Sequence, residues 1–329
     1  MATTVALNGS FLSRVEPILD EHVSEPIEFV PIPDDASDGT VRSAMTEADV
    51  LVGEWPEFEG ESSVRLVQQV GAGVDSYDRE ALPASAYLCN VYGHATGVAE
   101  HVFTLLLALR RRLLPLDREL REGQWPEPQI TGTVGELGGL TMGVVGFGRI
   151  GRALVAPAEA FGVDVVGLRS SEPTGSPPDG VEYVVGPDSL DRLLDDADVV
   201  VLSLPLAPET EHLIGAHELD ILGEEGYLIN VARGPIVDEW ALYDALTAGT
   251  IAGAGLDTWY NYPDDHDERC EPASVPFGEL DNVVMTPHIA GWTEPTAEHR
   301  WQFIAENIDR IARGERPENV VWAPSDGSS

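Results

Sequence analysis

The chain has 329 residues, of which 57 are acidic and 19 basic, and its formal net charge of −38 argues against nucleic acid or an anionic membrane as a partner. Hydrophobic residues make up 43% of the sequence, which is enough for one or two domains with substantial cores. Because Cys89 and Cys270 lack the spacing of a metal site, we expect no bound metal. We expect both thiols to be reduced, as in a cytosolic protein.

The first part of the chain predicts the alternating strands and helices of an α/β domain. The expected strands are residues 4–7, 27–30, 48–52, 64–70 and 86–91. A long helix is expected over residues 98–114, with Arg110, Arg111 and Arg112 toward its C-terminal end, where the helix dipole favours cations. Residues 124–135 then predict a loop or arm.

The most informative stretch is the turn after the apolar residues 142–145, which predict a short buried strand. This strand leads into Gly146-x-Gly148-x-x-Gly151 and then into a helix, the order that a dinucleotide fingerprint requires. Gly146 would permit the tight turn, Gly148 would let the backbone approach a pyrophosphate, and Gly151 would let helix and strand pack closely. A plain strand–helix turn is the alternative, but the strand before the glycines and the helix after them favour a cofactor bound at the helix start.

The next strand, residues 163–168, indicates which dinucleotide binds. It is followed by Arg169, Ser170 and Ser171, where an NAD-binding unit places an acid about 20 residues past the glycines. An acid would repel a 2′-phosphate, whereas Arg can hold one by forked, charge-assisted hydrogen bonds. A surface arginine is the alternative, and the sequence favours NADP(H) over NAD(H).

Further strands and one long helix complete the layout. The strands are expected at residues 181–185, 198–204, 226–231, 251–256 and 282–285, and the helix at 296–312. We expect an α/β fold of two Rossmann-like domains, one flavodoxin-like and one a doubly wound parallel sheet, with a cleft between them. Residues 1–95 plus 296–329 would form a discontinuous substrate-binding (catalytic) domain, and residues 96–295 the dinucleotide-binding domain.

Three polar side chains follow strands of the cofactor domain, where ligands bind in open α/β sheets. Arg233 could form a bidentate pair with a substrate carboxylate and polarise the neighbouring carbonyl. Asp257 could accept hydrogen bonds from a carboxamide, and His288, held after a proline, suits proton donation to a carbonyl that receives hydride. Taken singly, each could instead be a surface charge or a structural residue.

Together these segments resemble the D-isomer-specific 2-hydroxyacid dehydrogenase family over nearly the whole chain. Besides the glycine turn, the matching segments are residues 70–75, 98–101, 204–210, 230–237, 255–257 and 286–288. The resemblance implies an NAD(P)-dependent oxidoreductase that reversibly reduces 2-oxoacids to D-2-hydroxyacids. Arg233 would orient the 2-oxoacid, His288 would be the general acid, and Asp257 would hold the nicotinamide amide.

The same resemblance implies further contacts. The amides around Ala72 and Gly73 would help bind the substrate carboxylate, and a homodimer would form partly through the helix near Val98 and the arm before Gly138. The expected cofactor contacts are Gly146, Gly148, Arg149, Ile150, Gly151, Arg169, Ser170, Ser171, Leu204, Pro205, Thr210, Val231, Ala232 and Asp257.

The sequence departs from the family pattern at two positions. The family usually carries a Glu five residues after Asp257, facing the catalytic His, and this chain has Tyr262 there. Without a facing carboxylate, protonated His288 loses a favourable Coulomb partner. Either Asp264 or Asp265 swings in to replace it, or Tyr262 supplies only a hydrogen bond. The second departure is Arg169, which resembles the NADPH-preferring glyoxylate/hydroxypyruvate reductase branch.

Substrate choice depends on the aromatic residues near the expected site loops, which are Trp55, Tyr92, Trp259, Tyr260 and Trp292. They suggest room for a bulky or aliphatic 2-oxoacid, with Trp55 and Trp292 as substrate contacts, unless these rings only pack the domain interface. Glyoxylate and hydroxypyruvate are the alternative substrates.

Two other functions are alternatives to a reductase. An oxidative phosphoglycerate-type enzyme is disfavoured by Arg169, and a dinucleotide-sensing, corepressor-like binding protein is disfavoured by the presence of Arg233 and His288.

The charge pattern is typical of a protein adapted to high salt concentration. All 19 basic residues are Arg, and the acids are spread along the chain rather than gathered in one tail. Such a surface resembles that of proteins from extreme halophiles that accumulate salt in the cytoplasm. Residues 1–4 carry no signal-peptide pattern, and the longest apolar run, residues 105–109, is too short to span a bilayer. We therefore expect the protein to be located in a high-salt cytoplasm.

We expect the free energy of unfolding to rise as KCl increases from dilute buffer to molar concentration. The reason is that the screening length falls from about 10 Å at 0.1 M salt to about 3 Å at 1 M, which weakens repulsion among the excess acids. Urea titrations at several KCl concentrations measure this. A free energy of unfolding that stays level or falls with KCl would contradict the prediction.

Overall fold

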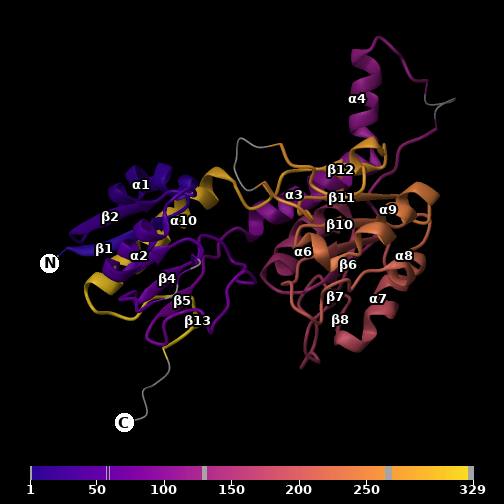
Figure 1. Cartoon of the computed structure of the whole chain (residues 1–329). Coiled ribbons are helices and arrows are strands. Elements are labelled where there is room, and N and C mark those ends of the chain that lie inside the picture. The colour runs from indigo at the N-terminus through magenta and orange to yellow at the C-terminus, as the bar shows by residue number, and fades with distance from the viewer. Residues whose placement is uncertain (1, 57, 59, 128–131, 264–268, 325–329) are drawn as a thin grey trace. The chain divides into compact units, whose positions relative to one another are not determined.

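The computed structural model describes residues 2–56, 58, 60–127, 132–263 and 269–324. The chain divides into two compact units, one of Met1–Gly93 with Thr293–Ser329 and the other of His94–Trp292 (Figure 1). Each unit contains one sheet and its own helices, so the predicted α/β class is confirmed. Across the described ranges, no helix is both long and apolar enough to cross a membrane.

The first unit is built on a six-stranded sheet in the order β13-β5-β4-β3-β1-β2, parallel except for β13, which runs antiparallel to β5. The strands are β1 (Thr3–Asn8), β2 (Ile27–Ile32), β3 (Val50–Val52), β4 (Leu66–Gln68), β5 (Tyr87–Cys89) and β13 (Val320–Trp322). The helices are α1 (Ser10–His22), α2 (Asp38–Glu47) and α10 (Glu294–Ala312). Apolar side chains of α1 and α10 share one core cluster with the sheet, and those of α2 share another.

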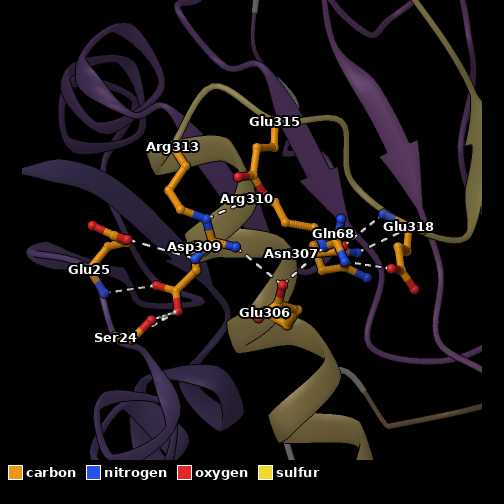
Figure 2. Close-up of polar contacts among 10 residues, drawn as sticks. All are labelled: Ser24, Glu25, Gln68, Glu306, Asn307, Asp309, Arg310, Arg313, Glu315 and Glu318. Carbon is orange, nitrogen blue, oxygen red and sulfur yellow. Dashed lines mark hydrogen bonds and ion pairs between the residues drawn. The ribbon is translucent and has the colours of Figure 1, made fainter.

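Two buried polar side chains near the end of α10 fasten the returning chain to the first sheet (Figure 2). Asp309 accepts hydrogen bonds from the amide and hydroxyl of Ser24 at 2.8 and 2.5 Å, just beyond α1. Asn307 donates to Gln68 Oε1 at 2.7 Å and accepts from the amide of Glu318 at 2.8 Å. These bonds explain why the last helix belongs to the same unit as the first strands.

The second unit has a seven-stranded parallel sheet in the order β12-β11-β10-β9-β6-β7-β8. Its strands are β6 (Thr141–Val145), β7 (Asp164–Leu168), β8 (Tyr183–Val185), β9 (Val199–Leu202), β10 (Tyr227–Asn230), β11 (Gly253–Leu256) and β12 (Val283–Met285). Its helices are α3 (Ala95–Arg110), α4 (Leu113–Arg121), α6 (Arg149–Phe161), α7 (Leu190–Asp196), α8 (Ala216–Leu222) and α9 (Glu239–Ala248), with short 3₁₀ turns η1 (Pro187–Ser189), η2 (Gly234–Ile236) and η3 (Phe277–Glu279). Continuous Val, Ile and Leu runs suit strands that helices cover on both faces.

The order of the second sheet reverses beside β6. The chain runs from β6 outward to β7 and β8, and then returns to the other side of β6 as β9. Such a switch point leaves a crevice at the carboxyl ends of the strands, which is where open α/β sheets bind their ligands. The glycine turn after β6 lies at this point.

One predicted element is wrong. The helix expected over residues 98–114 is two helices, because α3 ends at Arg110 and α4 begins at Leu113, with Arg112 between them at φ 50°. Both segments have helical periodicity, so the residue pattern did not indicate the left-handed residue that separates them. Figure 1 shows α4 standing away from the rest of its unit, and none of its residues is buried.

We expect Asn307→Leu to lower the free energy of unfolding by about 1–3 kcal/mol, because it leaves Gln68 Oε1 and the Glu318 amide without their partner. Urea denaturation in molar KCl measures the loss. The control is Gln302→Ala on the exposed side of the same helix, which we expect to change stability by less than about 0.5 kcal/mol. Equal effects of the two substitutions would contradict the prediction.

Candidate active site

The glycine turn after β6 is shaped by close contacts. Gly146 has φ 94°, and a Cβ there would lie 2.7 Å from both Ser203 O and Leu204 Cβ, so no larger residue fits. A Cβ on Gly151 would lie 3.0 Å from the ring of Phe147 and 3.1 Å from Val144 of β6, because α6 packs directly on this strand. On Gly148 a Cβ would be 3.8 Å from its nearest non-adjacent neighbour, so this side of the turn is open.

The turn has the features of a pyrophosphate cradle. Gly148 is the residue before α6, and the first-turn amides of Arg149, Ile150 and Gly151 have no carbonyl within the helix to bind. The first turn of α6 also carries no acidic residue, so nothing there opposes an anion at the positive end of the helix dipole. These residues fit a dinucleotide, and their individual cofactor contacts stay predictions.

Arg169, Ser170 and Ser171 follow β7 and are exposed. The Arg169 amide donates to Val185 O at 3.0 Å, which anchors the backbone of this residue at the end of β8. Within the described part of the chain, Arg169 has no acidic partner within salt-bridge distance. Its guanidinium is therefore able to meet a phosphate near the adenosine ribose position.

The loops after β9 and β10 hold the other predicted cofactor contacts. Leu204 packs against Gly146, and Thr210 Oγ1 accepts from the Ala207 amide at 2.8 Å and donates to Pro205 O at 2.9 Å. The Thr210 hydroxyl therefore shapes its own loop. Val231 and Ala232, which follow β10, are buried at 8% and 6% exposure. Their predicted cofactor contacts stay predictions.

Arg233 stands in a loop that its neighbours hold rigidly. Asn230, 1% exposed, accepts from the Ala232 amide at 3.0 Å and donates to Arg233 O at 2.8 Å. The Arg233 guanidinium donates to Ala232 O at 2.7 Å. A Cβ on Gly234 would collide with the backbone of Trp259, so the glycine lets the arginine loop pack directly on the segment that leads to Tyr262.

His288 and Tyr262 form a hydrogen-bonded pair. Tyr262 Oη lies 3.0 Å from His288 Nδ1 and accepts from the Trp259 amide at 3.1 Å. His288 adopts φ 55°, a left-handed conformation that non-glycine residues seldom take and that is often found at functional sites. The structure thus places Tyr262 at the position facing His288, whereas Asp264 and Asp265, the other candidates for this place, lie outside the described residues.

Asp257 is buried, with its side chain 1% exposed. Its carboxylate accepts from Thr286 Oγ1 at 2.6 Å, from the Ile289 amide at 2.9 Å and from the Ala290 amide at 3.0 Å. Burial opposes ionisation, but the nearby donor groups of His101, Thr286 and the two amides outweigh it and hold the pKa of Asp257 below its usual value. The contact with a nicotinamide amide stays a prediction. Asp257 Oδ2 could accept such a hydrogen bond, because it has one lone pair beyond the one used by the Ala290 amide.

The remaining predicted site residues lie in two places. Trp292, 41% exposed, belongs to the second unit, where its amide donates to Ile289 O at 2.9 Å. Ala72, Gly73 and Trp55 belong to the first unit. Asn90 Nδ2 donates to Ala72 O at 2.7 Å, and within the described residues no acceptor is found for the amides of Ala72 and Gly73, as an anion-binding turn requires.

Two of the five aromatic rings expected near the site, Trp259 and Tyr260, lie in the core instead. Trp259 is 5% exposed and packs on Phe277, and its Nε1 donates to Thr286 O at 2.8 Å. Tyr260 stacks on Phe277 and donates to Val237 O at 3.1 Å. These two rings fill the interior of the second unit. Trp55 lines a cavity of about 420 Å³ in the first unit together with Phe58.

Two residues with no role assigned from the sequence, His101 and Thr286, also lie in the site. His101 Nε2 lies 2.9 Å from Thr286 Oγ1 and 3.5 Å from Asp257 Oδ1. The available signal was helical spacing, since His101, Leu105 and Leu109 recur every four residues and share one face of α3.

Comparison with known proteins identifies the family. Residues 103–290 match the model of the D-isomer specific 2-hydroxyacid dehydrogenase NAD-binding domain. A glyoxylate reductase of Korarchaeum cryptofilum is 37% identical over 271 residues, which cover 80% of this chain and 78% of the relative. Two solved structures are also similar. The NADPH-dependent glyoxylate/hydroxypyruvate reductase of Sinorhizobium meliloti, in complex with NADP and malonate, is 27% identical with a TM-score of 0.80 over 98% of each chain.

The second structure is D-lactate dehydrogenase of Aquifex aeolicus complexed with NAD and lactic acid, 25% identical with a TM-score of 0.81 over 97% of this chain and all of that one. The match to the family model covers more than half of the chain, and the relative from Korarchaeum exceeds 30% identity over most of it. The predicted resemblance is therefore confirmed, and the chain belongs to the D-isomer specific 2-hydroxyacid dehydrogenase family.

Proposed function

We propose that the protein is an NADPH-dependent reductase of 2-oxoacids to D-2-hydroxyacids. The observation that carries this proposal is the His288–Tyr262 pair, because it holds an exposed imidazole at a strand end with its Nδ1 engaged. Bound at the glycine turn, NADPH would supply the hydride that reaches C2 of the substrate. The chain's own residues bind the 2-oxoacid, orient it and provide the proton.

Arg233 orients the substrate carboxylate in this proposal. A guanidinium carries five N–H groups in a rigid fork, so its bond to Ala232 O is compatible with a bidentate pair to a carboxylate. The positive charge also draws electron density from the adjacent carbonyl, which favours hydride addition. The hydrogen bonds of Asn230 to the Ala232 amide and the Arg233 carbonyl hold the backbone of this loop in place before the substrate arrives.

His288 donates the proton from Nε2, the ring nitrogen that does not face Tyr262. In the imidazolium form, Nδ1–H donates to Tyr262 Oη, which has a second lone pair beyond the one used by the Trp259 amide. Once Nε2 has given up its proton, the same bond to Tyr262 keeps the ring in place. A tyrosine hydroxyl is neutral, so it supports the imidazolium less strongly than a carboxylate would.

The cofactor is NADP(H) in preference to NAD(H). Support comes from Arg169, an exposed guanidinium at the end of β7 where an acid would mark an NAD enzyme. The Sinorhizobium relative, which holds NADP, agrees with this assignment, whereas the Aquifex relative holds NAD. The side chain at residue 169 therefore decides between the two cofactors in this proposal.

Among 2-oxoacids, we place glyoxylate and hydroxypyruvate before bulky aliphatic substrates. Of the five aromatic rings that suggested a bulky substrate, Trp259 and Tyr260 are used in core packing. The names of two relatives, a glyoxylate reductase and a glyoxylate/hydroxypyruvate reductase, support small substrates.

A homodimer completes the proposal. On α4 the side chains of Leu113, Leu114 and Leu120 are 57%, 50% and 52% exposed, and Trp125 beyond it is 82% exposed. Such a row of apolar side chains is unfavourable in water and would be covered in a dimer.

The acidic, lysine-free surface suits a high-salt cytoplasm, which we propose as the location of the protein.

We expect Arg169→Asp to reverse the cofactor preference, lowering kcat/KM with NADPH and raising it with NADH. The reason is that an acid repels the 2′-phosphate and binds the ribose hydroxyls. Initial rates with each cofactor measure the change. The control is Arg14→Asp, which makes the same charge change at an exposed position on α1 and should leave the ratio unaltered. Equal loss with both cofactors would instead indicate a structural role for Arg169.

We expect Tyr262→Phe to lower kcat by about 2- to 10-fold, because one hydrogen bond contributes about 0.5–1.5 kcal/mol. Tyr262→Glu should extend reduction to higher pH. A facing carboxylate raises the pKa of the imidazolium by roughly 1–3 units, and reduction needs the protonated ring, which persists only below that pKa. Rate–pH profiles of kcat for both variants test this. Wild-type turnover and an unchanged profile in Tyr262→Phe would dismiss a role for the hydroxyl.

A further inference from the structure

The face of α3 that covers the sheet is in register with β11. Leu109 and Leu105 lie over the two glycines of this strand, because a Cβ on Gly253 would be 3.3 Å from Leu109 and a Cβ on Gly255 would be 2.9 Å from Leu105. Four residues of helix rise about 6 Å and two residues of strand about 6.6 Å, so successive pairs stay matched. The next pair along this register is His101 over Asp257.

The hydrogen bonds at this third pair have a fixed direction. An ionised carboxylate only accepts, so the single hydroxyl proton of Thr286 goes to Asp257 Oδ1, 2.6 Å away. Thr286 Oγ1 must then accept in its 2.9 Å contact with His101, and the proton of that bond belongs to His101 Nε2. The bonds therefore run from His101 to Thr286 and from Thr286 to Asp257.

The carboxylate at the end of this series holds the backbone on both sides of His288. It binds Thr286, two residues before the histidine, and the amides of Ile289 and Ala290, the two residues after it. His288 between them has φ 55°, a conformation that persists only when its surroundings enforce it. The side chains of His101 and Asp257 are 17% and 1% exposed, so these bonds form largely out of water, where they are strong.

We propose that His101 is a positioning residue for His288, acting through Thr286 and Asp257. This inference rests on the proposed function, in which His288 donates the proton. Without the His101 donor, the Thr286 hydroxyl can turn to another acceptor, and the carboxylate loses one of the contacts that fix residues 286–290. The imidazole of His288 would then occupy its productive position for a smaller share of the time.

A purely structural role for His101 predicts something different. If His101 only filled space beside Leu105, replacing it with an apolar side chain would alter stability and leave turnover of the folded protein unchanged. A positioning role predicts a lower kcat with little change in the KM for the 2-oxoacid, because Arg233 still binds the carboxylate. Since misplacement of a reacting group by about 1 Å can cost about 10²-fold, a loss of that order is the expected size.

The test uses four variants of the full chain in molar KCl. His101→Leu removes the donor and Thr286→Val removes the hydroxyl, and we expect both to lower kcat about 10²-fold with KM nearly constant. His101→Gln restores an N–H at the position of Nε2 and should recover most of the rate. The control is His22→Leu, which replaces a histidine of similar exposure, 21%, in the other unit and should match the wild type. A folded His101→Leu variant with a kcat within twofold of wild type would overturn the proposal.

A second readout does not depend on turnover. Nitrogen-15 NMR of labelled histidine at one fixed pH reports which ring nitrogen of His101 carries the proton and whether the His288 ring signals move. We expect His101 to be protonated at Nε2, and the His288 signals to shift in His101→Leu and return in His101→Gln. A proton found only on Nδ1 of His101, or unmoved His288 signals, would overturn the inference. Failure of the wild type to reduce any 2-oxoacid would count against the proposed function alone.

Discussion

The candidate site depends on one buried charge. Moving a carboxylate out of water costs several kcal/mol unless donors surround it, and Asp257 meets this requirement with the Thr286 hydroxyl and the amides of Ile289 and Ala290. The same bonds join the end of β11 to the loop that carries His288. The carboxylate therefore joins two segments of the second unit and shapes the loop of its candidate acid at the same time.

Close backbone approach is the second constraint on this unit. Gly146 lets the turn after β6 touch residues 203–204 at the switch point of the sheet, and Gly234 lets the Arg233 loop lie on Trp259. Gly253 and Gly255 let α3 pack against β11. Each glycine removes the volume of a side chain where two segments must meet, so functional groups from distant parts of the sequence reach one edge of one sheet.

The sequence predicted much of this fold because its signals are local. The strand–glycine–helix order around Gly146 and the polar residues after β10, β11 and β12 can be read in short windows, and the α/β class followed from them. The break between α3 and α4 could not be predicted, because it depends on one left-handed residue, Arg112, inside a continuous helical pattern. The sequence offered Tyr262 as one of two alternatives beside His288, and the structure shows its hydrogen bond. The contact of His101 with Thr286 joins residues 185 positions apart, which a single sequence does not reveal.

The most direct test of the account is the initial rate of glyoxylate reduction with NADPH in molar KCl, measured for the wild type and for His288→Gln. Gln keeps an N–H group but cannot carry and release a proton, so we predict turnover by the wild type and a loss of about 10²- to 10⁴-fold in the variant, with NADPH binding retained. A variant as active as the wild type, or a folded, nucleotide-binding wild type that reduces no 2-oxoacid, would contradict the account.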